Sequence, residues 1–161
     1  MRIVLLGDIL GNLEALRAAL DGAARIGYET IFHTGNLVGH GAHPNEVIDL
    51  IREREIEGVR GDLDECAAWE AQPARAGQGE KERAQADSAY QWTLGHLGFS
   101  QRNYLKDLPF AILREIGNRQ VLLCHASPMD LYVPIEEDAT DAALEEMADE
   151  AQAELLLFGH T

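Results

Sequence analysis

The chain has 161 residues, of which 46% are hydrophobic and 25% charged, a composition typical of one globular domain with its own core. It holds 13 Lys and Arg against 28 Asp and Glu, which gives a formal net charge of −15 at pH 7. A surface this acidic repels phosphate backbones, which excludes general nucleic-acid binding and means that phosphate chemistry would require a metal ion. We therefore expect a single domain over residues 1–161.

The sequence contains no pattern typical of a membrane or secretory segment. The longest apolar run, residues 155–158, falls far short of the ~20 residues that span a bilayer. The apolar N-terminal stretch runs directly into Asp8 without a cleavage site of small residues, so it predicts a strand rather than a signal peptide. Cys66 and Cys124 lie far apart and lack CxxC spacing, which indicates two reduced thiols. The expected compartment is the cytoplasm.

Three strand-to-helix units are predicted in the first 70 residues. In each unit a short apolar run ends near a glycine, and a polar residue then precedes a helical pattern. The strands are predicted at 3–6, 30–34 and 56–60. The helices are predicted to begin after Asn12 as N-cap, at Pro44 and at Asp64. Repetition of this unit favours a parallel α/β sheet.

The second half of the sequence is less regular. Residues 72–87 lack apolar periodicity and contain Pro73, so they predict a mobile surface loop. Trp92 and Leu105 are the expected core contacts of the helices that follow, and the Gly117-Asn118 pair predicts a β-hairpin. The predicted ranges are 89–97 and 101–108 for these helices, 110–116 and 119–124 for the hairpin strands, 141–153 for an acidic amphipathic helix and 154–158 for a last buried strand.

Polar side chains follow five predicted strands at the point where each strand ends. They are Asp8, Asn36, Asp62 with Asp64, His125 and His160. Loops at the carboxyl ends of the strands in an α/β sheet converge on one crevice, so we expect these side chains to meet there. A mixed set of carboxylates, an amide and imidazoles suits one of the divalent ions of Mn, Fe or Zn.

Each of these residues also has a purely structural interpretation. Asp8 and Asp62 are compatible with helix caps, and Asn36 is compatible with a tight turn. His125 and His160 are compatible with core histidines that donate to backbone carbonyls. On that interpretation the protein is an interaction domain without a metal. Independent caps at five separate strand ends are harder to explain than one shared site, which favours metal binding.

Five blocks of the sequence occur in the order found in one enzyme family. They are Asp8-Ile9-Leu10-Gly11-Asn12, Gly35-Asn36-Leu37-Val38-Gly39, Gly61-Asp62-Leu63-Asp64, His125-Ala126-Ser127-Pro128 and Gly159-His160-Thr161. With these blocks the chain resembles the calcineurin-like metallophosphoesterases, in particular their small bacterial phosphodiesterase branch, whose pattern is D-x-H-G-N, G-D-x-V-G, G-N-H-D, H-x-S-P and G-H-T-H. The resemblance covers almost the whole chain. It implies a β-sandwich flanked by helices, and two divalent ions bridged by a carboxylate and by a hydroxide that attacks phosphorus in line.

The resemblance also assigns roles to individual positions. The first ion would be bound by Asp8, the position of Leu10, Asn36 and a histidine one place beyond Thr161. The second ion would be bound by Asn36, Asp62, His125 and His160. The histidine that protonates the leaving group in the family falls at Leu63.

Departures from the family pattern predict an eroded site. Leu10 cannot bind a metal, Leu63 cannot donate a proton and Asn36 is a neutral bridge, so we expect at most one divalent ion. Loss of the acid alone removes a contribution of roughly 10²- to 10⁴-fold. We therefore expect weak or absent phosphoester hydrolysis and a binding or regulatory role. The alternative is an active phosphodiesterase or phosphatase whose site is completed in trans or by the loop residues His40 or His43.

Members of the family usually continue with strands that complete the second sheet. The sequence stops just after the apolar stretch 155–158, so the second sheet is expected to be incomplete. An uncovered sheet edge favours pairing with another chain, and we expect a homo-oligomer or a complementing partner besides a phosphoester or phosphate-containing ligand. A fragment of a longer protein would give the same pattern, and the sequence leaves these options open.

Overall fold

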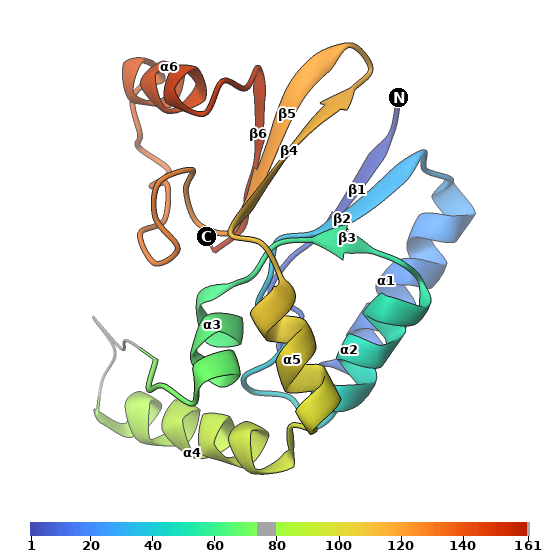
Figure 1. Ribbon diagram of the computed structural model, residues 1–161, viewed down its shortest axis with the longest axis vertical. Coiled ribbons are helices and arrows are strands. Elements are labelled where there is room, and N and C mark those ends of the chain that lie inside the picture. Colours follow the sequence, from blue (N-terminus) through green and yellow to red (C-terminus); the bar gives the residue numbers. More distant parts are fainter. Residues whose placement is uncertain (74–79, 161) are drawn as a thin grey trace.

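The structure is a computed structural model that describes residues 1–73 and 80–160. Within these ranges it contains two three-stranded sheets and six helices (Figure 1). The strands are β1 Ile3–Leu6, β2 Thr30–His33, β3 Glu57–Gly58, β4 Ala111–Ile116, β5 Arg119–Cys124 and β6 Leu155–Leu157. The helices are α1 Leu13–Ile26, α2 Pro44–Glu53, α3 Asp62–Trp69, α4 Glu80–His96, α5 Phe99–Asp107 and α6 Asp141–Glu150. No helix in the described parts of the chain is long and apolar enough to cross a membrane.

The first sheet is parallel, with strand order β1-β2-β3. The two predicted helix starts are confirmed. The Asn12 side chain caps α1 by accepting from the Ala15 amide at 3.0 Å, and Pro44 occupies the first turn of α2. The larger hydrophobic core packs these helices against Leu6 and Ile31 of the sheet. The predicted parallel α/β arrangement is therefore confirmed.

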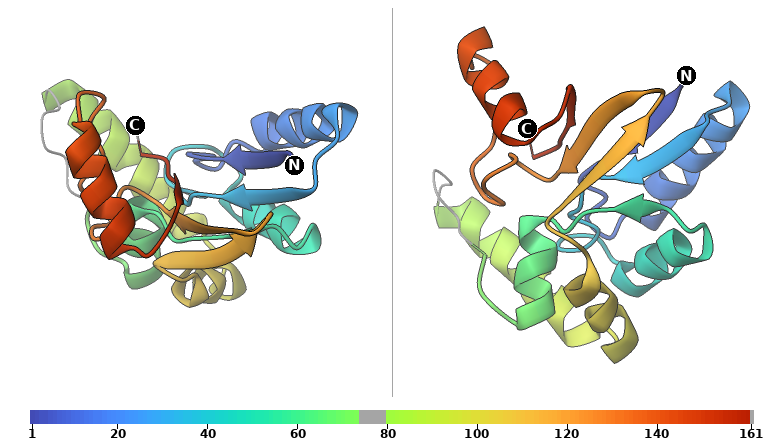
Figure 2. Two further views of the ribbon diagram at one scale, coloured as in Figure 1. Left: turned by 90° about the horizontal axis from the view of Figure 1, so that it is seen from above. Right: turned by 45° about the horizontal axis from the view of Figure 1, so that its top comes forward.

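The second sheet has the order β4-β5-β6. The antiparallel hairpin of β4 and β5 turns at Gly117 and Asn118, which both have positive φ, as the Gly-Asn pair predicted. β6 pairs parallel to β5 at the edge of the sheet. A smaller core of Phe32, Val59, Ile112 and Leu123 joins the two sheets, opposite the helices α1, α2, α3 and α5. Figure 2 shows that α6 lies beside β6, away from α1 and α2.

The predicted loop over residues 72–87 is wrong in its second half, because α4 begins at Glu80. Residues 74–79 of that loop lie outside the described part of the chain. The first turns of α4 are formed by strong helix formers such as Glu82, Ala84 and Gln85, whose side chains are exposed. Exposed helix positions need no apolar period, and this is why the sequence pattern did not indicate a helix here.

Two predictions of burial, for Trp92 and for the last strand, differ from the structure. Trp92 is 41% exposed and stacks on His96 instead of entering the core, with the ring centroids 3.9 Å apart. Tyr90, two residues earlier, is the aromatic side chain of α4 that is fully buried. The predicted buried strand at 154–158 forms the edge strand β6, in which Leu155 is 39% exposed. Leu105 is fully buried, as predicted.

Arg102 ties three helices together and gives a test of the fold. Its guanidinium donates to the carbonyls of Ala67 at 2.9 Å and Leu94 at 3.3 Å and pairs with Glu70. Since Arg102→Ala leaves both carbonyls unpaired, it should lower the free energy of unfolding by about 2 to 3 kcal/mol in urea titrations. The control Arg114→Ala, at an exposed pair with Glu57, should cost less than about 1 kcal/mol. Equal losses for both variants would contradict the role given to Arg102.

Candidate metal centre

Three loops meet around Thr34, the residue that follows β2. The Thr34 amide donates to the carbonyl of Leu6 at 2.8 Å, which joins the ends of β1 and β2. A Cβ atom on Gly7 or Gly159 would come within 2.7 or 2.5 Å of the Thr34 hydroxyl oxygen, so both neighbours must be glycine for the loops to approach this closely. The Gly159 amide in turn donates to the carbonyl of His125 at 2.7 Å. The ends of β1, β2, β5 and β6 are thereby held together.

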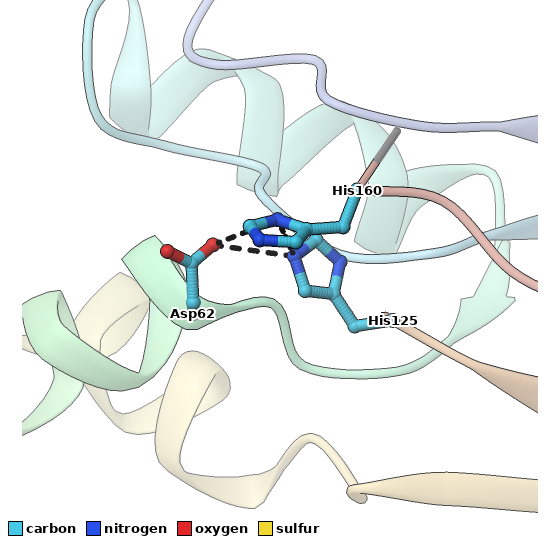
Figure 3. Close-up of side chains that lie close together, drawn as sticks. All are labelled: Asp62, His125 and His160. Carbon is cyan, nitrogen blue, oxygen red and sulfur yellow. Dashed lines mark hydrogen bonds and ion pairs between the residues drawn. The ribbon is translucent and has the colours of Figure 1, made fainter. Parts of the chain in front are cut away.

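Asp62, His125 and His160 converge at this meeting point (Figure 3). The Nε2 atom of His125 lies 3.2 Å from Asp62 Oδ1 and 3.1 Å from His160 Nδ1, and His160 Nδ1 lies 3.6 Å from Asp62 Oδ1. Among the described residues this is the one group of three or more such side chains with metal-binding geometry. Residues 62, 125 and 160 come from α3 and from the loops after β5 and β6.

The tautomer of His125 follows from its contact with Thr34. Its Nδ1 atom lies 2.6 Å from the Thr34 carbonyl, which can only accept, so Nδ1 carries the hydrogen. In the neutral ring the Nε2 lone pair therefore points at Asp62 and His160, whereas in the protonated ring Nε2 donates to Asp62. An imidazole whose other nitrogen donates to a backbone carbonyl is the usual arrangement of a metal-binding histidine.

Asp62 and His125 shift each other's protonation equilibria. Burial by itself would raise the pKa of Asp62, but hydrogen bonds from His125 and Asn36 outweigh it and the pKa is lowered. Burial by itself would lower the pKa of His125, but its hydrogen bonds to Asp62 and Thr34 outweigh it and the pKa is raised. Asp62 is therefore ionised, and the place between the two side chains attracts a cation.

The spacing of the three donor atoms fits one metal ion. Two ligand atoms on a tetrahedral ion with bonds of about 2.0 to 2.1 Å lie about 3.3 Å apart. The separations of 3.1, 3.2 and 3.6 Å scatter around this value. A carboxylate with two imidazoles suits Zn, Mn or Fe, and three protein ligands leave a further position open.

Asn36 holds Asp62 in place. Its amide nitrogen donates to Asp62 Oδ1 at 2.8 Å, and its amide oxygen accepts from the Leu63 backbone amide at 3.0 Å. Both ends of the buried amide are thus used. The role of Asn36 as a metal ligand stays a prediction, since the second lone pair of its amide oxygen is not used by these two bonds.

Asp8 lies apart from the group of three. Its side chain is exposed just after β1, and its charge is the smallest of the causes that raise the pKa of His125. Its role as a ligand also stays a prediction. The Leu10 amide donates to the Asn36 carbonyl at 2.8 Å, so the loops that carry these residues are linked through their backbones.

Hydrocarbon occupies the position to which the resemblance assigns the proton donor. Leu63 is buried against Gly39, where a Cβ atom would lie 2.7 Å from Leu63 Cδ1. The loop histidines His40 and His43 are exposed and lie outside the group of three. Their proposed role as substitute donors or ligands stays a prediction.

Asp64 was predicted among the polar residues at the strand ends, but neither its supporting role nor that of Thr34 was recognised from the sequence. The fully buried carboxylate of Asp64 accepts from the backbone amides of Leu37, Val38 and Gly61 at 2.8 to 3.2 Å, which fixes the loop after β2 against the start of α3. Burial raises the pKa of Asp64 to about 7, against the effect of these three donors. A clue was available: aspartate three residues after a glycine N-cap is typical of a capping side chain.

Comparison with known proteins places the chain in a family. Residues 1–161 match the calcineurin-like phosphoesterase superfamily domain. Uncharacterized protein MJ0912 of Methanocaldococcus jannaschii is 32% identical over 131 residues, which cover 78% of this chain and 49% of that protein. The chain therefore spans about half the length of this curated relative.

Two solved structures share the fold. Hypothetical protein PH1004 from Pyrococcus horikoshii OT3 superimposes with a TM-score of 0.78 at 26% identity, over 98% of this chain and 68% of that one. A metallophosphoesterase from Sphaerobacter thermophilus gives a TM-score of 0.69 at 28% identity, over 99% of this chain and 60% of that one. Because the family match extends over the whole sequence, the chain belongs to the calcineurin-like phosphoesterase superfamily, as its five sequence blocks predicted.

Proposed function

We propose that this chain binds one divalent ion through Asp62, His125 and His160 and holds phosphoesters there with weak or absent turnover. The observation that carries the proposal is the triangle of donor atoms with sides of 3.1, 3.2 and 3.6 Å. Hydrocarbon at Leu10 and Leu63 argues against a second ion and against a proton donor at those positions. The eroded site thus favours a binding or regulatory role.

Asp62, His125 and His160 would hold the divalent ion, which when bound would polarise a phosphoryl oxygen and acidify bound water. The protein's part is to hold the ligands: the Thr34 carbonyl orients His125, and the amide of Asn36 orients Asp62. Without a second ion the clamp on the leaving oxygen is missing, and without an acid at Leu63 a poor leaving group departs unprotonated. Phosphate binding should therefore exceed hydrolysis.

An active phosphodiesterase or phosphatase is the second candidate. It is favoured by His40 and His43, which lie exposed in the loop that follows Asn36, and by the open edge at β6, where Leu155 is exposed. A second copy or a complementing chain paired at that edge would bring further side chains to the site. Hydrolysis whose specific rate rises with protein concentration, together with a dimer in sedimentation, would favour this candidate.

Metal analysis with a matched pair of variants tests the proposal. The wild-type chain should bind one equivalent of Zn²⁺ or Mn²⁺ in calorimetry and hydrolyse bis-nitrophenyl phosphate slowly or not at all. His160→Ala removes a metal ligand. Its affinity for the ion should therefore fall by more than the roughly 10- to 100-fold that is typical of losing a residue hydrogen-bonded to a ligand. His96→Ala, at an exposed histidine of α4, should bind like wild type. No bound ion would favour the interaction domain, and two ions with rapid turnover would favour the active enzyme.

A further inference from the structure

The loop of residues 127–135 lies directly beside the candidate metal centre. It begins two residues after His125, and Figures 1 and 2 show it between β5 and α6, next to the C-terminal end of the chain and over α3. Asp62 is the first residue of that helix. The backbone of the loop therefore lies beside the elements that carry Asp62 and His160.

Hydrogen bonds and two buried side chains hold this loop in one shape. The Asp130 carboxylate accepts from the amides of Tyr132 and Val133 at 2.6 and 3.0 Å. The Asp130 amide donates to the hydroxyl of Ser127 at 3.0 Å. Leu131 and Ile135 are buried and attach the loop to the body of the protein. A surface carried by such a loop is preorganised for binding.

Three large side chains of the loop are exposed. Met129, Tyr132 and Val133 are exposed by 69, 47 and 59% of their surfaces. Burial raises the pKa of the Tyr132 phenol, and the charges of Cys66, Glu65 and Asp62 raise it further, as expected for a ring on a loop beside the start of α3. An exposed apolar group is unusual next to an ionic site in a chain of net charge −15.

We infer that the loop surface of Met129, Tyr132 and Val133 binds the organic group of a phosphoester, and that this group is an aromatic ring. The inference rests on the proposed function, in which the metal ion holds the phosphate. The acidic surface repels the anionic phosphate, so the organic group must contribute affinity. The face of a tyrosine stacks on planar rings, and a methionine sulfur adds contacts at a ring edge. Tyr132 is therefore the specificity-determining residue.

Phosphonates that cannot be hydrolysed test this inference by binding alone. With Zn²⁺ bound, the wild-type chain should bind phenylphosphonate about tenfold more tightly than methylphosphonate in calorimetry, a preference typical of one aromatic contact. Tyr132→Ala should reduce the preference to less than about twofold and leave the affinities for methylphosphonate and Zn²⁺ unchanged. Tyr132→Phe should keep the preference, because the ring face and not the hydroxyl makes the contact.

The control is Tyr28→Ala, which removes an exposed tyrosine before β2, at the end of that strand remote from Thr34. It should retain the wild-type preference. If wild type binds Zn²⁺ but shows no preference, or if Tyr132→Ala keeps it, the inference is overturned while the proposed function stands. If wild type binds no ion, the proposed function fails and the inference fails with it.

Discussion

Replacement of Asn36 by Asp is expected to make the stability of the fold depend on metal. In the native chain the Asn36 amide nitrogen donates to Asp62 Oδ1 at 2.8 Å. In Asn36→Asp a carboxylate oxygen takes the place of that donor and faces a second carboxylate in a largely buried position. Like charges at this distance should cost about 3 kcal/mol without metal. A divalent ion between the two carboxylates removes the repulsion and should restore the loss.

The measurement is thermal unfolding with EDTA and with excess Zn²⁺ or Mn²⁺. In EDTA, Asn36→Asp should unfold roughly 6 to 12 °C below wild type, and with metal this gap should close or reverse. Asn118→Asp introduces the same charge in the exposed hairpin turn and should change neither curve by more than a few degrees. If excess metal does not restore the unfolding temperature of Asn36→Asp, the placement of an ion beside Asp62 is contradicted.

The elements that the sequence predicted well are those with local signals. Asn12 caps α1 through a bond to a residue only three places away, and Gly117-Asn118 fix the hairpin turn by their own backbone preference. The position of Trp92 was wrong because the phase of α4 depends on what the helix packs against. Tyr90 is buried there and donates to the Ala71 carbonyl, a contact that no periodicity within the helix indicates.

The candidate site could be predicted as a set of residues but not as a geometry. The residues at the strand ends carried the family pattern, and Asp62, His125 and His160 do meet. The contacts that orient them join distant parts of the chain: 91 residues separate Thr34 from His125, and 26 separate Asn36 from Asp62. Such contacts depend on how the loops pack. Sequence reasoning therefore could not foresee that the Asn36 amide links Asp62 to the start of α3, and the role of Asn36 as a metal ligand stays a prediction.

His33 should make the protein less stable in mild acid. The ring is fully buried at the end of β2, and among the described residues neither of its nitrogens has a hydrogen-bond partner. Burial lowers the pKa of His33 from 6.5 to about 4. His33 therefore becomes protonated below pH 6.5 in the unfolded chain but only below about pH 4 in the folded chain. The contribution of neutral His33 to the free energy of unfolding is fully present above pH 6.5. It decreases by about 3 kcal/mol as the pH is lowered to about 4.

The pH dependence of unfolding in urea for wild type and His33→Phe isolates this effect. Asp64 acts in the opposite direction, because burial raises its pKa to about 7 and the unfolded chain ionises first as the pH rises. His33→Phe should keep the pH dependence that Asp64 causes and lose the one that His33 causes. The difference between the free energies of unfolding of the variant and of wild type should therefore grow by about 3 kcal/mol from pH 7 to pH 4. Ile31→Val, on the same strand, should shift the curve without changing its slope. Parallel curves for wild type and His33→Phe would mean that the buried ring finds a partner that stabilises its charge.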